Sequence, residues 1–124
     1  MEIAVTASDG GFLVGDASGV TFAKVKKVPR GIPIIKTSTS KALLSQTLQV
    51  FKTLPTKIQN RVISIDAKTR DSITFNLTRG VQIIWGGSEE QDLKIEVLNE
   101  LLADPNNKNV KKFDISSPLA PTVR

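Results

Sequence analysis

The side chains that could carry out chemistry are few, because the sequence contains neither cysteine nor histidine. Their absence excludes disulfide bonds, a cysteine nucleophile and the zinc sites that these two residues build. It also removes histidine, the commonest general base near neutral pH. An enzyme with this sequence would therefore have to work with carboxylates, lysine or serine.

Three acidic residues, Glu89, Glu90 and Asp92, stand close together and could bind a metal ion or act as an acid and base pair. They also fall at the predicted start of a helix, where the helix dipole favours negative charge. Stabilisation of that helix explains the acidic group more simply than a metal site or a catalytic site does.

The stretch Gly86-Gly87-Ser88 precedes the same helix and could hold a phosphate through free backbone N–H groups. It lacks the following lysine and the longer glycine spacing of a phosphate-binding loop. Ser40 and Lys41 could form a nucleophile and base pair, but neighbours on a helix do not face each other. We therefore expect no enzyme activity, no catalytic residue, no metal site and no cofactor.

Basic residues outnumber acidic ones by 17 to 12, which gives the chain a net charge of +5. The densest basic group consists of Lys24, Lys26, Lys27 and Arg30. It fits a solvated loop, and the alternative is a binding site for nucleic acid or for an anionic membrane surface. With one tryptophan and no tyrosine, the chain offers little of the aromatic surface on which single-stranded nucleic acids stack.

The 124 residues suffice for one domain with one core. Alternating apolar residues predict a strand at 3–7 and a hairpin from 12–14 and 20–25. Three further strands show a clean period of two, so one face of each is expected to be buried. Arg79-Gly80 is predicted to form the tight turn between the last two of these strands. The inward positions are Ile63, Ile65 and Ala67, then Ile73, Phe75 and Leu77, then Val81, Ile83 and Trp85.

The single tryptophan, Trp85, is in phase with Ile83 and Val81. This phase favours packing in the core near the end of a sheet. The alternative is a surface anchor for a partner protein, a role in which tryptophan is also common.

The first of two amphipathic helices is predicted after Ser38-Thr39-Ser40, which offers several N-cap residues. Leu44, Leu48 and Phe51 recur on one side of this helix. Pro55 limits the helix, because proline disfavours the α conformation of the residue before it.

The second helix is expected to begin at Ser88, with Gln91 completing a capping box. Lys94 falls within its apolar stripe, and we expect the stem of Lys94 to lie along the core edge while the ammonium reaches water. Short hairpins mixed with two such helices predict an α+β fold, with a bent, mostly antiparallel sheet and both helices packed on one face. The apolar stripe is Leu93, Val97, Leu98, Leu101 and Leu102.

The segment from Phe113 to Arg124 is predicted to contain the last strands, interrupted at Pro118. A strand at the edge of a sheet exposes unpaired backbone groups, and natural proteins blunt such edges with prolines and charges. Pro118 and Pro121 could serve that purpose. The other interpretation is that a partner's extended segment pairs with this edge, where proline is tolerated if its missing N–H points away from the ladder.

A series of short motifs in a fixed order extends over nearly the whole chain. The motifs are Val14–Phe22, Gly31-Ile32-Pro33, Ile83–Gly86, Lys94 with Leu98, Leu101 and Leu102, Phe113–Pro118 and Pro121–Arg124. In this order and spacing the series resembles the extracytoplasmic β domain of the bacterial division protein family FtsQ/DivIB. The Trp-Gly pair and the Asp-x-Ser-Ser-Pro ending are most similar to the actinobacterial variant.

The resemblance implies a non-enzymatic scaffold domain of the division complex, which supports septum formation. Family members are single-pass proteins of the plasma membrane whose extracytoplasmic part contains a POTRA domain and then a β domain. We therefore expect residues 11–124 to be the β domain and residues 1–10 to be the last strand of a POTRA domain cut short. Neither nucleic acid nor a small-molecule substrate is expected as a partner.

The resemblance also implies the partners, which are the coiled-coil division proteins FtsB/DivIC and FtsL. In the family a strand of FtsB/DivIC adds to the last strands of the β domain. Pro121 departs from a regular docking strand, because the ladder must skip a bond there. Carried onto this chain, the partner-binding residues are Phe113, Ser116, Ser117, Leu119, Ala120, Pro121, Thr122, Val123 and Arg124.

Overall fold

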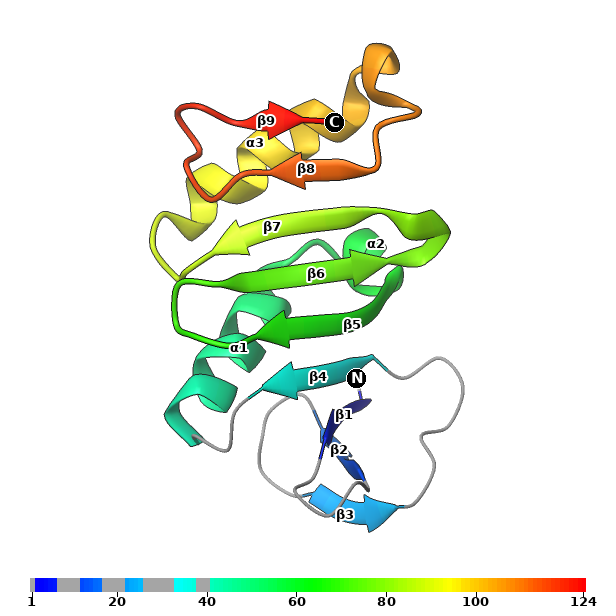
Figure 1. Cartoon of the computed structure of the whole chain (residues 1–124), viewed down its shortest axis with the longest axis vertical. Coiled ribbons are helices and arrows are strands. Elements are labelled where there is room, and N and C mark those ends of the chain that lie inside the picture. The colour runs from blue at the N-terminus through cyan, green and yellow to red at the C-terminus, as the bar shows by residue number, and fades with distance from the viewer. Residues whose placement is uncertain (1, 7–11, 17–21, 26–32, 38–40) are drawn as a thin grey trace.

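A computed structural model of the chain describes residues 2–6, 12–16, 22–25, 33–37 and 41–124, and its described strands form one nine-stranded sheet. The strand order across the sheet is β3-β2-β1-β4-β5-β6-β7-β8-β9 (Figure 1). The strands are β1 (Glu2–Thr6), β2 (Phe12–Asp16), β3 (Phe22–Val25), β4 (Ile34–Thr37), β5 (Val62–Ala67), β6 (Ile73–Leu77), β7 (Gln82–Gly86), β8 (Lys112–Asp114) and β9 (Thr122–Val123). The helices are α1 (Lys41–Thr53), α2 (Thr56–Gln59) and α3 (Gln91–Ala103).

The described sheet is mostly antiparallel, as predicted. β1 pairs in parallel with β4, β4 with β5, and β7 with β8, whereas the five other neighbouring pairs are antiparallel. Parallel neighbours need a crossover connection, which a helix usually supplies. Here α1 and α2 connect β4 to β5, and α3 connects β7 to β8.

In the view of Figure 1, α1 and α2 lie behind β5 and β6, and α3 lies behind β8 and β9, so the helices are on one side of the sheet and the predicted α+β arrangement is confirmed. α1 buries Leu48 and Phe51 at the predicted spacing, and Pro55 follows directly after the buried Leu54. A short α2 then buries Ile58. Ser40 lies outside the described residues, as do Lys26, Lys27 and Arg30, and of Lys24 and Lys41 only the backbone is described.

The core is built on the two strands with the cleanest alternation, β6 and β7. Every second residue of β6, namely Ile73, Phe75 and Leu77, is buried. Trp85 is fully buried and packs edge-on against Phe75, with ring centroids 5.8 Å apart and planes at 77°. The prediction that Trp85 belongs to the core is therefore confirmed.

Arg79 and Gly80 lie in the connection between β6 and β7, as predicted, although the connection also includes Thr78. Arg79 and Gly80 both have positive φ angles, 67° and 73°. The Leu77 N–H donates to the Val81 carbonyl at 2.7 Å, which closes the hairpin. Three residues, Thr78–Gly80, separate Leu77 from Val81, so the loop is one residue longer than a two-residue type I′ turn.

The prediction that Ile63 faces inward was wrong, because the side chain is 52% exposed. The register between β5 and β6 shifts between Val62 and Ser64, which is a β-bulge. One extra residue reverses the alternation locally, so that Val62 takes the buried position and Ile63 turns outward.

The predicted capping box at the second helix was also wrong. α3 begins at Gln91, after Glu90 in a left-handed conformation with φ 55°, and no side chain caps this end. Gln91 does not reach back to Ser88, because its Oε1 accepts from Trp85 Nε1 at 2.6 Å. Its Nε2 donates to Thr53 Oγ1 at 3.3 Å. Gln91 thus joins the start of α3 to the core and to the end of α1.

The prediction that the ammonium of Lys94 reaches water was also wrong. The side chain is only 2% exposed. Its Nζ donates to the Gly87 carbonyl at 3.0 Å and lies 5.8 Å from the centroid of the Trp85 ring. Lys94 therefore fastens α3 to the loop that leaves β7.

Burial lowers the pKa of the Lys94 ammonium below its ordinary value of 10.5. The carboxylates of Glu89, Glu90 and Asp71 act in the opposite direction and offset part of this shift. A lysine whose pKa is lowered by folding holds its proton more weakly in the folded state than in the unfolded state.

The variant Lys94→Met, which removes the charge at similar length, should reveal this shift. Between the lowered pKa and 10.5 the unfolded wild-type chain binds more protons than the folded one, so wild-type stability rises with pH across that window. The free energy of unfolding, measured in urea at about pH 7, 8, 9 and 10, should therefore rise in wild type relative to the variant. Lys68→Met, at an exposed lysine, controls for the loss of one charge. A wild-type to variant difference that does not change with pH would contradict a buried ammonium.

Candidate protein-binding edge

The candidate site is the hairpin formed by β8 and β9, and its inner strand belongs to the core. β8 runs parallel to β7, with Phe113 beside Ile83, and the Ile115 N–H donates to the Ile84 carbonyl at 3.0 Å. Phe113 is 2% exposed and Ile115 is fully buried. Apolar burial on both sides of Asp114 therefore holds β8 firmly in the sheet.

β9 is one of the two edge strands of the described sheet, and β3 is the other (Figure 1). It pairs antiparallel with β8, with Val123 opposite Phe113 and Thr122 opposite Asp114. The Arg124 N–H donates to the Lys112 carbonyl at 2.9 Å, and the Lys112 N–H donates to the Arg124 carbonyl at 3.2 Å. Among the described residues no strand pairs with the far side of β9.

The hydrogen-bond register of β9 decides which backbone groups remain open. Residues of an antiparallel pair alternate between those that exchange hydrogen bonds and those that do not. Arg124 exchanges both bonds with Lys112, so Val123 turns its N–H and C=O away from β8. Pro121, two residues earlier, has no N–H to offer.

The connection between the two strands is held by short local bonds. Asp114 Oδ1 accepts from the Ser116 N–H at 3.1 Å and from Ser116 Oγ at 2.6 Å. The Ala120 N–H donates to the Ser117 carbonyl at 2.9 Å, and Pro118 is buried. Pro118 thus anchors the loop, and the residues after it extend outward.

The structure places the predicted partner-binding residues in two groups. Phe113 lies in the core, so its side chain is not available to a partner and its role is to hold β8. Leu119 is 87% exposed and Val123 is 37% exposed, so both apolar side chains are accessible to a partner. The remaining predicted residues, Ser116, Ser117, Ala120, Pro121, Thr122 and Arg124, are all exposed.

Arg124 was predicted to bind the partner, but sequence reasoning missed the basic residues that lie near it. We call the whole set the basic cluster: Arg79, Lys111, Lys112 and Arg124. Lys111 Nζ donates to the Arg79 carbonyl at 3.1 Å, and the Lys111 N–H donates to the Arg124 carbonyl. Within the described part of the chain, none of the four forms an ion pair with a carboxylate. The cluster combines three separate segments, so neither spacing nor local charge density signals it.

The Gly86-Gly87-Ser88 stretch, which could have held a phosphate, is not suited to one in the structure. A Cβ added at Gly87 would lie 2.6 Å from Glu89 Oε2 and 2.9 Å from Asp71 Oδ1, so carboxylates occupy the space beside the glycines. Negative charge at that point repels a phosphate. The described residues also contain no group of three or more acidic side chains that could hold a metal ion.

Comparison with known proteins agrees with this architecture. The family model described as the C-terminal part of the cell division protein FtsQ/DivIB matches residues 4–116. The chain belongs to the FtsQ/DivIB family. Residues 117–124, which include β9, lie beyond the matched range.

FtsQ proteins of actinobacteria align with almost all of the chain. The cell division protein FtsQ of Streptomyces bingchenggensis is 31% identical over 131 aligned residues, which cover 97% of this chain and 48% of that protein. FtsQ of Mycobacteroides abscessus is 35% identical over 122 residues, covering 96% of this chain and 37% of that protein. The chain therefore spans half or less of the length of these two relatives.

A solved structure shares the fold. The major extracytoplasmic domain of the division protein DivIB from Geobacillus stearothermophilus superposes with a TM-score of 0.56 at 15% identity, over 73% of this chain and 80% of that one. At this identity the likeness concerns the fold alone. Among the described residues, no helix has the length and apolar character needed to cross a membrane.

Gly86 of this FtsQ/DivIB domain positions the β8–β9 connection, and alanine there should destabilise the fold. Gly86 has φ +86°, and a Cβ would lie 3.0 Å from the Ser116 Cβ and 3.3 Å from its Cα. Strain and crowding together should lower the free energy of unfolding by about 2–4 kcal/mol in urea titrations. Gly80→Ala is the matched control, because Gly80 has φ +73° and nothing within 4 Å. It should lose about 1–2 kcal/mol from strain alone. Equal losses would show that Ser116 moves aside freely.

Proposed function

We propose that this domain is a non-enzymatic scaffold of the bacterial division complex that binds coiled-coil division proteins of the FtsB/DivIC and FtsL type. A partner strand adds to β9 and supports septum formation by joining the partner to the complex. The observation that carries the proposal is the unpaired outer side of β9 on a β8 strand that is buried in the core.

Strand addition suits this edge for two physical reasons. Main-chain hydrogen bonds from an added strand satisfy backbone groups that otherwise face water, and alternate side chains supply specificity. Because β8 is fixed by Phe113 and Ile115, the edge is presented in one conformation, which lowers the entropy lost on binding. Leu119 and Val123 are open apolar residues that a partner could cover.

The family supports a location outside the cytoplasm for this domain. The DivIB domain with the same fold is described as extracytoplasmic, and the FtsQ relatives are longer than this chain. We propose that the full-length protein is anchored in the plasma membrane by one helix and that this domain lies on its extracytoplasmic face. We also propose that residues 1–10, which contribute β1 beside β2 and β4, derive from the end of a POTRA domain.

Deleting Pro121 to Arg124 should abolish partner binding and leave the fold intact. The deleted residues are all exposed, so the core loses little apolar burial. The truncated domain should unfold cooperatively in urea and fail to co-purify with FtsB/DivIC and FtsL from the same organism. Unchanged affinity of the folded, truncated domain in a titration would contradict the proposal.

A single substitution offers a milder test of the same surface. Leu119→Ala removes the most exposed large apolar side chain and should weaken the partner complex about 5- to 30-fold, the effect of about 1–2 kcal/mol. Ile63→Ala is the matched control, because Ile63 is also an exposed apolar residue but lies on β5, away from the edge. Its complex should keep the wild-type affinity in isothermal titration calorimetry. Equal losses in both variants would place the contact elsewhere.

A further inference from the structure

The outer side of β9 offers very little backbone to a partner. Thr122 and Arg124 turn toward β8, so Val123 is the one residue of β9 whose N–H and C=O both face outward. Pro121 can accept a hydrogen bond but cannot donate one. Because one residue supplies nearly the whole ladder, side chains must provide most of the binding free energy and most of the specificity.

On the helix side of the sheet, the side chain of Val123 is the surface that a partner strand would contact. Val123 stands directly opposite Phe113, so the two side chains share one face. Phe113 is part of the core against which Leu101 and Leu102 of α3 pack. A residue that pairs with Val123 points to this same face, where an apolar side chain would cover the exposed part of Val123.

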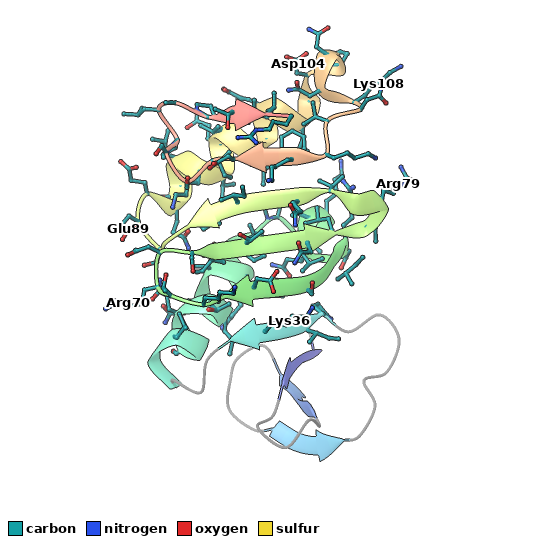
Figure 2. The ribbon with its side chains drawn as sticks, in the orientation of Figure 1. Lys36, Arg70, Arg79, Glu89, Asp104 and Lys108 are labelled. Carbon is teal, nitrogen blue, oxygen red and sulfur yellow. The ribbon has the colours of Figure 1, made fainter. Side chains whose placement is uncertain are left out.

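The opposite face of the hairpin carries more basic than acidic residues. Side chains alternate along a strand, so Arg124 and Lys112 project to the face opposite Val123 and Phe113. Asp114 shares that face, and its Oδ1 accepts hydrogen bonds from Ser116. Lys111 and Arg79 complete the basic cluster at the same end of the sheet. Figure 2 shows Arg79 at this end and Glu89 at the opposite end. The excess of positive charge thus lies next to the open edge and not on an unrelated surface.

We infer that the segment added to β9 places an apolar residue opposite Val123 and an acidic residue next to it, beside the basic cluster. This inference rests on the proposed strand addition and specifies the chemistry of the partner. The neighbours of the apolar residue point to the face of Arg124 and Lys112, where a carboxylate meets these two side chains. An acidic peptide fits better than an anionic surface, because the charges adjoin unpaired backbone.

Two short synthetic peptides test the inference directly. Both alternate valine and threonine, and they differ in whether glutamate or lysine flanks the central valine. Titration into the ¹⁵N-labelled domain should move the Val123 amide resonance with the glutamate peptide. The lysine peptide should bind at least about tenfold more weakly, and added sodium chloride should weaken only the glutamate peptide.

Variants of the domain separate the backbone contribution from the charge contribution. Val123→Pro removes the outward N–H and should weaken the glutamate peptide about tenfold, more than Val123→Ala, which keeps that N–H. Lys111→Glu and Arg124→Glu should each weaken it about three- to tenfold. Lys36→Glu makes the same charge change on β4, far from the edge, and should leave binding unchanged (Figure 2). Thermal unfolding of each variant confirms that it is folded.

Four results would overturn the inference. They are equal binding of both peptides, binding of neither, no effect of Lys111→Glu and Arg124→Glu, or Lys111-dependent binding to phosphatidylglycerol vesicles without binding of either peptide. The proposed function fails separately, when wild-type domain does not co-purify with the division proteins. A domain that co-purifies but binds both peptides equally keeps the proposed function and loses the acidic partner segment.

Discussion

Phe113 stands beside Ile83 where β8 joins the sheet parallel to β7, and the open edge exists because of this contact. Both side chains are buried, together with Ile115, so apolar burial fixes β8 although only three residues form the strand. The parallel direction requires α3 as a crossover, and Lys94 and Gln91 fasten the start of that helix to Gly87 and Trp85. The polar contacts at the start of α3 and the apolar contacts of β8 thus together fix the strand with which β9 pairs.

The edge is open to a partner strand and is also protected against indiscriminate pairing, two properties that usually conflict. An open strand invites indiscriminate pairing, and natural proteins reduce that risk with prolines, charges and short strands. Here β9 has two residues, Pro121 lacks an N–H, and Arg124 carries a charge. The same features leave Val123 as the one residue of β9 whose N–H and C=O both face outward, with basic residues nearby. They therefore discourage pairing with most strands and favour a strand of matching chemistry.

The sequence predicted the parts of the fold that depend on local pattern. Alternation predicted the buried faces of β6 and β7, because side chains of a strand alternate whatever its neighbours are. It failed at Ile63, since a bulge is a backbone shift that leaves the residue types unchanged. The prediction that the Lys94 ammonium reaches water failed, because the carbonyl that accepts its hydrogen bond comes from a loop whose path is set by tertiary packing. The β8–β9 edge followed from position and family resemblance, whereas the basic cluster joins three segments and needed the structure.

Hydrogen–deuterium exchange of the wild-type domain, alone and bound to its coiled-coil division partner, tests the central claim most directly. If a partner strand adds to β9, the Val123 amide faces water in the free domain and is hydrogen-bonded in the complex. We expect its exchange to slow on binding by at least about tenfold, with little change in α1 and α2. Protection of the helices with unchanged exchange at Val123 would contradict strand addition at this edge.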